Sequence, residues 1–485
     1  MSTEQVRDRE DEARLTKTGP PRGGDGEVPV RRGGVRFWRS SLMLCAVLAL
    51  VAFGLGAAGV LRPPSLASAS IAADRAVKTA GERLVLKGRI PVASVDADQV
   101  TVTPAVPFTV QSSESSVTLR FTGPLDYGTE YQVAVTGVRS QYTSTTADWH
   151  YSFGTPAVAL YSLIAHRSDG VENDAVVSNE QGRTHALLSA PEIESYVATP
   201  GMLVAISQAD PDSSALLAVD RTTGASLPAA LPTAGLATEL HAAPDGGKFG
   251  YVLTATDDAS TYQSTLFIAD SSDLAAPAVE VKAAGQPLAV REWLFVPGVD
   301  AVVVIDPQDQ AFLIYLDGAT PPVPLGSAGQ LVGFLPGSSV LMAVAGGKEV
   351  LLDLASGLNA EVPKTPDPDK QTIAGRRSFR AVGDYLVEFN TIKKRGNGKG
   401  VTTRLANVTR TGTTDLFTLA DGQGQLLNSG LSPNGQFAWA TVLAPDAPEE
   451  DQWSGASDRS TTKIFDLATG QQVASIPGSS PVWAA

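Results

Sequence analysis

The chain of 485 residues is acidic, with 51 Asp and Glu against 37 Lys and Arg and a net charge of −14. An exterior of this sign argues against nucleic acid as a partner, because nucleic-acid binding relies on a basic surface. Apolar residues make up 43% of the chain and charged residues 18%. This composition is typical of a protein with a packed core and excludes a chain that is disordered throughout. A chain of this length is expected to form two or three domains.

The first segments are predicted to be a tail and a membrane span. Residues 1–36 mix both charges with Gly and Pro and contain few apolar side chains, which predicts a disordered cytoplasmic tail. Residues 37–62 are predicted to hold a single transmembrane helix, since the run Ser41–Leu61 has no charged residue. At about 1.5 Å per residue, such a run crosses a hydrocarbon core of about 30 Å.

The charges that flank this run predict its orientation. More basic residues precede it than follow it, so the N-terminus is expected in the cytoplasm and the C-terminal domains outside the cell membrane. Those before the run are Arg22, Arg31, Arg32, Arg36 and Arg39, and those after it are Arg62, Arg75 and Lys78. Cleavage by a signal peptidase after Ala69 stays open, although the length of the apolar run favours an uncleaved anchor.

Residues 63–80 are predicted to be a linker of small residues, and residues 81–155 a small β-sandwich. The sandwich is indicated by alternating apolar and polar residues between turns rich in Gly, Pro and Ser. The expected strands are Arg83–Lys87, Gln99–Thr103, Val117–Thr122, Glu130–Gly137 and Asp148–Phe153.

This segment resembles the bacterial immunoglobulin-like (Ig-like) domain of S-layer and other cell-surface proteins, of the SbsA type. The resemblance rests on Val100–Pro104, on Pro124-Leu125 followed by Gly128–Val133, and on Trp149 with Phe153. It implies a spacer or adhesion module and carries no catalytic residues.

Residues 157–485 are predicted to form a seven-bladed β-propeller, because one pattern of turns and apolar strands recurs along them. Six turns containing Gly precede apolar runs and are typical of the turn between the first two strands of a blade; they start at Pro200, Pro244, Pro297, Pro336, Gly383 and Pro433. Seven outer turns are expected at Asn179, Asp220, Asp270, Asp317, Asp353, Asn407 and Asp466. Their spacing fits four-stranded blades, with six or eight blades as alternatives.

Seven outer turns but only six inner turns leave one blade without an inner strand, and we predict that the end of the chain supplies it. Ser480–Ala485 would complete the first blade, whose other strands lie in Val158–Ser189, and this closure removes two aggregation-prone sheet edges. Leu216–Gly224 and Lys463–Gly470 resemble repeats of the WD40-like and quinoprotein-like propellers of bacterial envelopes. That resemblance implies a fold and no particular chemistry.

The sequence contains few residues typical of catalysis or metal binding. The four histidines, His150, His166, His185 and His241, lack the spacing of metal ligands. The chain has no hydrolase G-x-S-x-G motif and no nucleotide-binding fingerprint. We therefore assign no catalytic residue, metal or cofactor, and the sequence favours a protein that is not an enzyme.

Loops on one face of the propeller are predicted to carry charge. Acidic residues dominate the loops of the first four blades, at Asp169, Glu172, Asp174, Asp210, Asp212, Asp257, Asp258, Asp306 and Asp309. The sixth blade is basic there, with Lys393, Lys394, Arg395 and Lys399. An insertion in the seventh blade, Ala444–Thr462, contains Glu449, Glu450, Asp451 and Trp453.

We expect these last two loops to be neighbours and to form a partner-binding patch, because opposite charges orient a partner and an exposed Trp anchors it. The alternative is a pair of solvated loops with weak surface salt bridges.

Two functions from different classes follow. The first is a membrane-anchored extracytoplasmic scaffold of the bacterial envelope, whose propeller binds a protein or cell-wall polymer while the Ig-like domain acts as spacer. The alternative is an extracytoplasmic hydrolase or lyase that acts on envelope glycans or peptides through carboxylates in the propeller channel. A third hypothesis, a sensor that signals inward, has the least support, because the predicted tail of residues 1–36 has no kinase or DNA-binding pattern.

Overall fold

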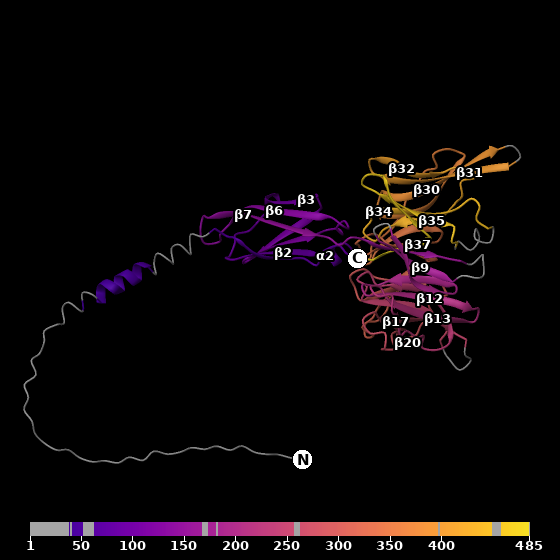
Figure 1. Cartoon of the computed structure of the whole chain (residues 1–485), viewed down its shortest axis with the longest axis horizontal. Helices are drawn as coiled ribbons and strands as arrows, with labels where there is room; N and C mark the ends of the chain where they lie inside the picture. Colours follow the sequence, from indigo (N-terminus) through magenta and orange to yellow (C-terminus); the bar gives the residue numbers. More distant parts are fainter. Residues whose placement is uncertain are drawn as a thin grey trace, which may run out of the picture. The chain divides into compact units, whose positions relative to one another are not determined.

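The computed structural model describes residues 38, 41–51, 63–166, 173–180, 183–256, 262–395, 398–448 and 457–484. The chain divides into two units, residues 1–62 and residues 63–485. In the first unit residues 41–51 are helical (Figure 1). No helix within the described ranges has both the length and the apolarity needed to cross a bilayer. The predicted tail, residues 1–36, and the rest of the predicted span lie outside the described residues.

The second unit begins with a β-sandwich. One sheet has the order β1-β2-β5-β4 and the other the order β3-β6-β7. Alternating residues of both sheets fill the space between them, among them Leu84, Leu119, Tyr131, Val133 and Trp149. The strands are β1 (Leu66–Ser70), β2 (Arg83–Gly88), β3 (Val100–Thr103), β4 (Phe108–Ser113), β5 (Ser116–Phe121), β6 (Glu130–Arg139) and β7 (Thr146–Gly154), with a 3-10 turn η1 (Ala97–Gln99) before β3.

The segment 63–80 belongs to this sandwich, which corrects the predicted linker. It contains β1, antiparallel to β2, and the short helix α2 (Ala73–Ala76). Ala76 and Val77 are buried in the sandwich core, and Trp149 Nε1 donates to the Pro64 carbonyl at 2.7 Å. Small Ala and Ser residues give too weak an apolar alternation to reveal an edge strand from sequence.

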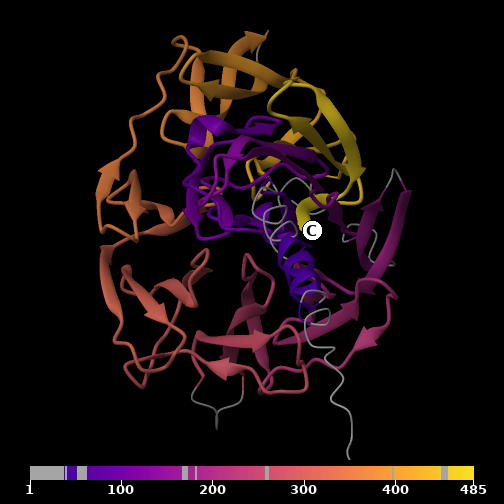
Figure 2. The same cartoon turned by 90° about the vertical axis from the view of Figure 1, so that its left-hand side faces the viewer.

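The remainder of the described chain forms a β-propeller. Seven successive four-stranded antiparallel sheets are arranged as a ring (Figure 2). The first strands of neighbouring sheets contact one another, as β11 does β15 and β15 does β21, which places them on the inside of the ring. We call each sheet a blade and number the blades along the ring.

The strands of each blade pair in order from the inside of the ring outward. The first blade is β37 (Ser479–Ala484), β8 (Ala159–Ile164), β9 (Asp174–Glu180) and β10 (Arg183–Ala190). The second is β11 (Ile193–Ala198), β12 (Met202–Asp210), β13 (Ser213–Asp220) and β14 (Ser226–Leu227), and the third is β15 (Gly235–Ala242), β16 (Lys248–Ala255), β17 (Thr265–Asp270) and β18 (Val279–Glu280). A two-stranded hairpin of β19 (Lys282–Ala283) and β20 (Gln286–Pro287) follows the third blade.

The fourth blade is β21 (Glu292–Phe295), β22 (Ala301–Ile305), β23 (Gln310–Tyr315) and β24 (Val323–Ser327). The fifth is β25 (Gln330–Phe334), β26 (Val340–Ala345), β27 (Lys348–Asp353) and β28 (Asn359–Glu361). The sixth is β29 (Thr372–Ala381), β30 (Asp384–Arg395), β31 (Gly398–Thr409) and β32 (Gly412–Leu419), and the seventh is β33 (Gln425–Leu431), β34 (Phe437–Leu443), β35 (Ser460–Asp466) and β36 (Gln472–Pro477).

The chain end closes the ring, as predicted. In the first blade β37 pairs antiparallel with β8, with Val482 opposite Tyr161 and Trp483 opposite Leu160. The Tyr196 hydroxyl of the second blade donates to the carbonyl of Ser480 at 2.6 Å. The last strand therefore joins the first blade and bonds to the second.

The second strands of the blades are buried on both faces, which explains their continuous apolar runs. All five residues of β22 are buried. Between the second and third blades, Val204 and Ile206 pack in one core with Phe249 and Tyr251. The propeller is thus stabilised mainly by apolar contacts between neighbouring sheets.

The outer turns show why Asp recurs in them. Asp220 Oδ1 accepts the amides of Thr222 and Thr223 at 2.9 and 2.7 Å, and Gly224 adopts a φ of 68°. Asp353 similarly accepts the Ala355 amide at 3.0 Å and the Ser356 hydroxyl at 2.6 Å. Asn407 departs from this pattern, because it lies inside the long strand β31 and the turn follows at Thr409–Gly412.

These contacts make the turns sensitive to acid. The hydroxyl of Ser356 and the amide of Ala355 lower the pKa of Asp353. A carboxyl whose pKa is lower in the folded state stabilises the fold above its unfolded pKa, about 3.9, and loses this contribution as the pH falls. We expect the wild type to unfold at a higher temperature than Asp353→Asn at pH 7, and the gap to shrink between pH 5 and pH 3. Calorimetry at several pH values checks this, and a gap independent of pH would contradict it.

Candidate partner-binding surface

The sixth blade carries a projecting ribbon. Its middle strands β30 and β31 have 12 residues each. Pairing with β29 extends only to Thr391, and pairing with β32 begins at Thr403. Residues 392–395 and 398–401 therefore pair with each other and form a two-stranded extension that projects from the rest of the blade (Figure 1). We call these residues the ribbon.

The ribbon brings together the predicted basic residues of the sixth blade. Lys393 and Lys394 are exposed in β30, and Arg395 is its last residue. In the backbone register of the ribbon, Lys394 lies opposite Lys399. On a chain with a net charge of −14, this is a local basic site.

Apolar residues lie at the base of the ribbon. Ile392 is opposite Val401, which is 44% exposed, and Ile373 of β29 is also exposed. The Val401 amide donates to Asp421 Oδ1 at 3.3 Å, from the connector between β32 and β33. The ribbon thus combines exposed apolar side chains, lysines and strand edges.

The acidic half of the predicted patch lies outside the described residues: Glu449, Glu450, Asp451 and Trp453. The sixth and seventh blades, which carry the two loops, share an apolar core that includes Leu405 of β31 and Ala438 and Ala440 of β34. Near the start of the insertion, Asp446 forms an ion pair with Arg459 at 3.0 Å. That the two loops form one patch stays a prediction.

Three of the described carboxylates of the predicted acidic rim accept backbone amides. Asp174 is buried and accepts the amides of His166 and Ile193, both at 2.8 Å. Asp210 Oδ1 accepts the Asp212 amide at 3.0 Å, and Asp306 Oδ1 accepts two amides of its own turn. Asp169, Glu172, Asp257 and Asp258 lie outside the described residues. The spacing of acidic residues in these loops is therefore explained in part by turn geometry.

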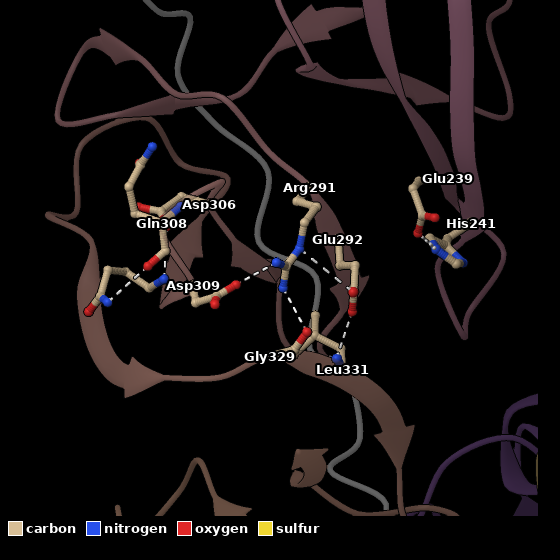
Figure 3. A network of polar contacts seen from close by, with 10 residues as sticks. Glu239, His241, Arg291, Glu292, Asp306, Gln308, Asp309, Gly329 and Leu331 are labelled. Atoms are coloured by element: carbon tan, nitrogen blue, oxygen red, sulfur yellow. Dashed lines mark hydrogen bonds and ion pairs between the residues drawn. The ribbon is translucent and has the colours of Figure 1, made fainter. Parts of the chain in front are cut away.

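A second polar cluster joins the inner strands of the third, fourth and fifth blades (Figure 3). Glu292 Oε2 accepts the Leu331 amide at 2.7 Å. Arg291 forms an ion pair with Asp309 and donates to the Gly329 carbonyl at 2.7 Å. These contacts bridge β21 to β25 and to the turn after β22, so the carboxylates of Glu292 and Asp309 serve to position strands.

The same cluster contains a histidine beside a carboxylate. His241 Nε2 lies 3.3 Å from Glu239 Oε2 (Figure 3), and the indole Nε1 of Trp293 donates to the Glu239 carbonyl at 2.9 Å. Glu239 sits at a bulge of β15 with a φ of 52°, which sequence patterns do not reveal. Among the described residues, no group of three His, Cys, Asp or Glu is placed to hold a metal ion.

No protein-family model matches the chain. No curated protein matches it either. The similar solved structures include a protein from Lactobacillus plantarum, which is 11% identical with a TM-score of 0.42 over 68% of this chain and 99% of that one.

Two further solved structures are similar to this chain. The Cps50 (Swd1) β-propeller domain from Myceliophteria thermophila is 11% identical with a TM-score of 0.37, over 60% of this chain and 89% of that one. KlHsv2 with loop 6CD replaced by a Gly-Ser linker is 15% identical with a TM-score of 0.32, over 60% and 82%. The propeller assignment rests on the strand pairing described above.

Proposed function

We propose that this protein is a membrane-anchored extracytoplasmic scaffold whose β-propeller binds a protein or cell-wall partner through the ribbon of the sixth blade. The projecting ribbon with Lys393 and Lys394 is the observation that carries the proposal. A basic, partly apolar extension on an acidic protein fits the attraction and orientation of a partner. The carboxylates of Glu292 and Asp309 are held by strand-positioning contacts, and this favours binding over hydrolysis.

The anchor is the uncharged run Ser41–Leu61, whose residues 41–51 are helical. An uncleaved anchor is supported by the position of Ala69 within β1, where it pairs with Leu86. Cleavage after Ala69 would cut this strand and expose the edge of β2. The Ig-like resemblance of the sandwich that follows fits the role of a spacer.

The proposal is tested on envelopes of cells that express the full chain. We expect the protein to stay in the membrane pellet after an alkaline carbonate wash and to retain a reproducible crosslinked partner. The double variant Lys393→Glu with Lys394→Glu is expected to stay in the pellet but to lose at least about tenfold of the captured partner, since each lysine becomes repulsive.

The control changes the charge equally at two other exposed lysines, Lys87→Glu with Lys364→Glu. It is expected to capture the partner like the wild type. Release by carbonate would overturn the anchor, and equal capture by both double variants would overturn the role of the ribbon.

A further inference from the structure

The ribbon has an unpaired strand edge along β31. The amide of Ile392 points away from β31, because it donates to the Gln371 carbonyl at 2.7 Å. In an antiparallel pair, opposite residues alternate between hydrogen-bonded and outward-facing pairs. Ile392 and Val401 are therefore an outward-facing pair, and Lys394 and Lys399, two residues further, are the next. The β31 edge presents the backbone groups of Val401 and Lys399, since β32 begins to pair only at Thr403.

A carboxylate of the chain itself already occupies part of this edge. Asp421 Oδ1 accepts the Val401 amide at 3.3 Å, near the long limit for a hydrogen bond. A Cβ atom on Gly400 would lie 2.7 Å from Asp421 Oδ2, so the absence of a side chain at Gly400 lets the carboxylate approach. The position of Asp421 shows that this edge accepts an anionic hydrogen-bond acceptor.

The lysines of the ribbon select what adds to the edge. Lysine on an edge strand opposes pairing with a second basic strand, which protects the ribbon against another copy of itself. The same charges attract an acidic segment. The exposed Val401 shares one face of the ribbon with Ile392, which lies opposite it in β30, and the exposed Lys393 is on the other face. A strand with alternating acidic and apolar residues therefore complements this edge.

We propose that the β31 edge of the ribbon receives an extended acidic segment of a partner protein as an added strand, which displaces Asp421 from the Val401 amide. This inference rests on the proposed function and names the class of partner for the same surface. Backbone hydrogen bonds supply affinity, and the lysines supply selectivity for acidic residues.

The test uses the full chain in detergent micelles and a fluorescein-labelled acetyl-(Glu-Val)4-amide peptide, with (Lys-Val)4 as the matched control. Fluorescence anisotropy is expected to show salt-sensitive binding of the acidic peptide only. Asp421→Ala should tighten binding about fivefold, because the Val401 amide becomes free. Val401→Pro should weaken peptide binding about tenfold, because proline has no amide hydrogen to donate. The ribbon itself tolerates this proline, because the Val401 amide points away from β30 and makes no hydrogen bond to it.

The outcomes separate this inference from the proposed function. If Val401→Pro and Asp421→Ala both bind like the wild type while Lys393→Glu with Lys394→Glu does not, the ribbon binds anions without strand addition, as it would a cell-wall polymer. That result overturns the inference and leaves the proposed function standing. If the acidic peptide does not bind and the partner from envelopes is captured equally well by Val401→Pro, strand addition is likewise excluded.

Discussion

Truncation of the chain after Pro477 is expected to abolish cooperative unfolding of the propeller. It removes β37 and leaves β8 as an open edge with Leu160 and Tyr161 uncovered. It also removes the Ser480 carbonyl that accepts the Tyr196 hydroxyl. We expect the cooperative thermal transition to disappear, a larger effect than the loss of about 0.5 to 3 kcal/mol that single substitutions usually cause. Thermal unfolding followed by circular dichroism and light scattering measures it.

The control for this truncation is restoration in trans. A synthetic peptide of residues 478–485, added in excess, is expected to recover the transition, because a ligand that binds only the folded state stabilises it. Tyr196→Phe should remove only about 1 kcal/mol, the typical contribution of one hydrogen bond. A truncated protein that unfolds at the wild-type temperature would show that the ring is stable without its last strand.

Replacement of Arg377 by Met is expected to destabilise the contact between the fifth and sixth blades by about 3 kcal/mol. The Arg377 side chain is 7% exposed, pairs with Glu349 of β27 and donates to the Pro363 carbonyl at 2.6 Å. It also lies over the rings of Phe379 and Tyr385. Its loss leaves the carboxylate of Glu349 without its partner, which costs more than the ion pair contributed. Denaturation by urea measures the loss.

Two variants make this result interpretable. In Arg377→Met with Glu349→Gln no unpaired charge remains, and about half of the lost stability should return. The nearby pair Lys348 and Glu361 is exposed, with side chains 61% and 65% accessible, so Lys348→Ala should cost less than about 1 kcal/mol. Equal losses for Arg377→Met and Lys348→Ala would show that burial does not strengthen the Arg377 contact.

Much of the propeller is predictable from sequence, because its turns use residues with a local physical requirement. Asp220 and Gly224 are recognisable since one accepts turn amides and the other adopts a positive φ. The closing strand is predictable because an apolar segment follows the last turn. Strand β1 is not predictable in this way, because small residues that pack at an edge have no distinctive alternation.

Only part of the candidate site can be predicted from sequence in the same way. Lys393 and Lys394 stand beside a Gly-rich turn and are recognisable as a charged hairpin. The contact of Asp421 with the Val401 amide depends on the exact register of β30 and β31, and on a connector from outside the hairpin. The predicted turn at Asn407 is wrong for a related reason, since nothing local indicates that β31 is as long as 12 residues.

The pairing of β37 with β8 also orders events during synthesis. Strand β8 emerges from the ribosome more than 300 residues before its neighbour, so the first blade waits until the codons of residues 479–484 are translated. Until then its hydrogen-bonding edge is bare, in a state that favours association between nascent chains. A ribosome that stops before these codons therefore releases a product with an exposed strand edge in its first blade.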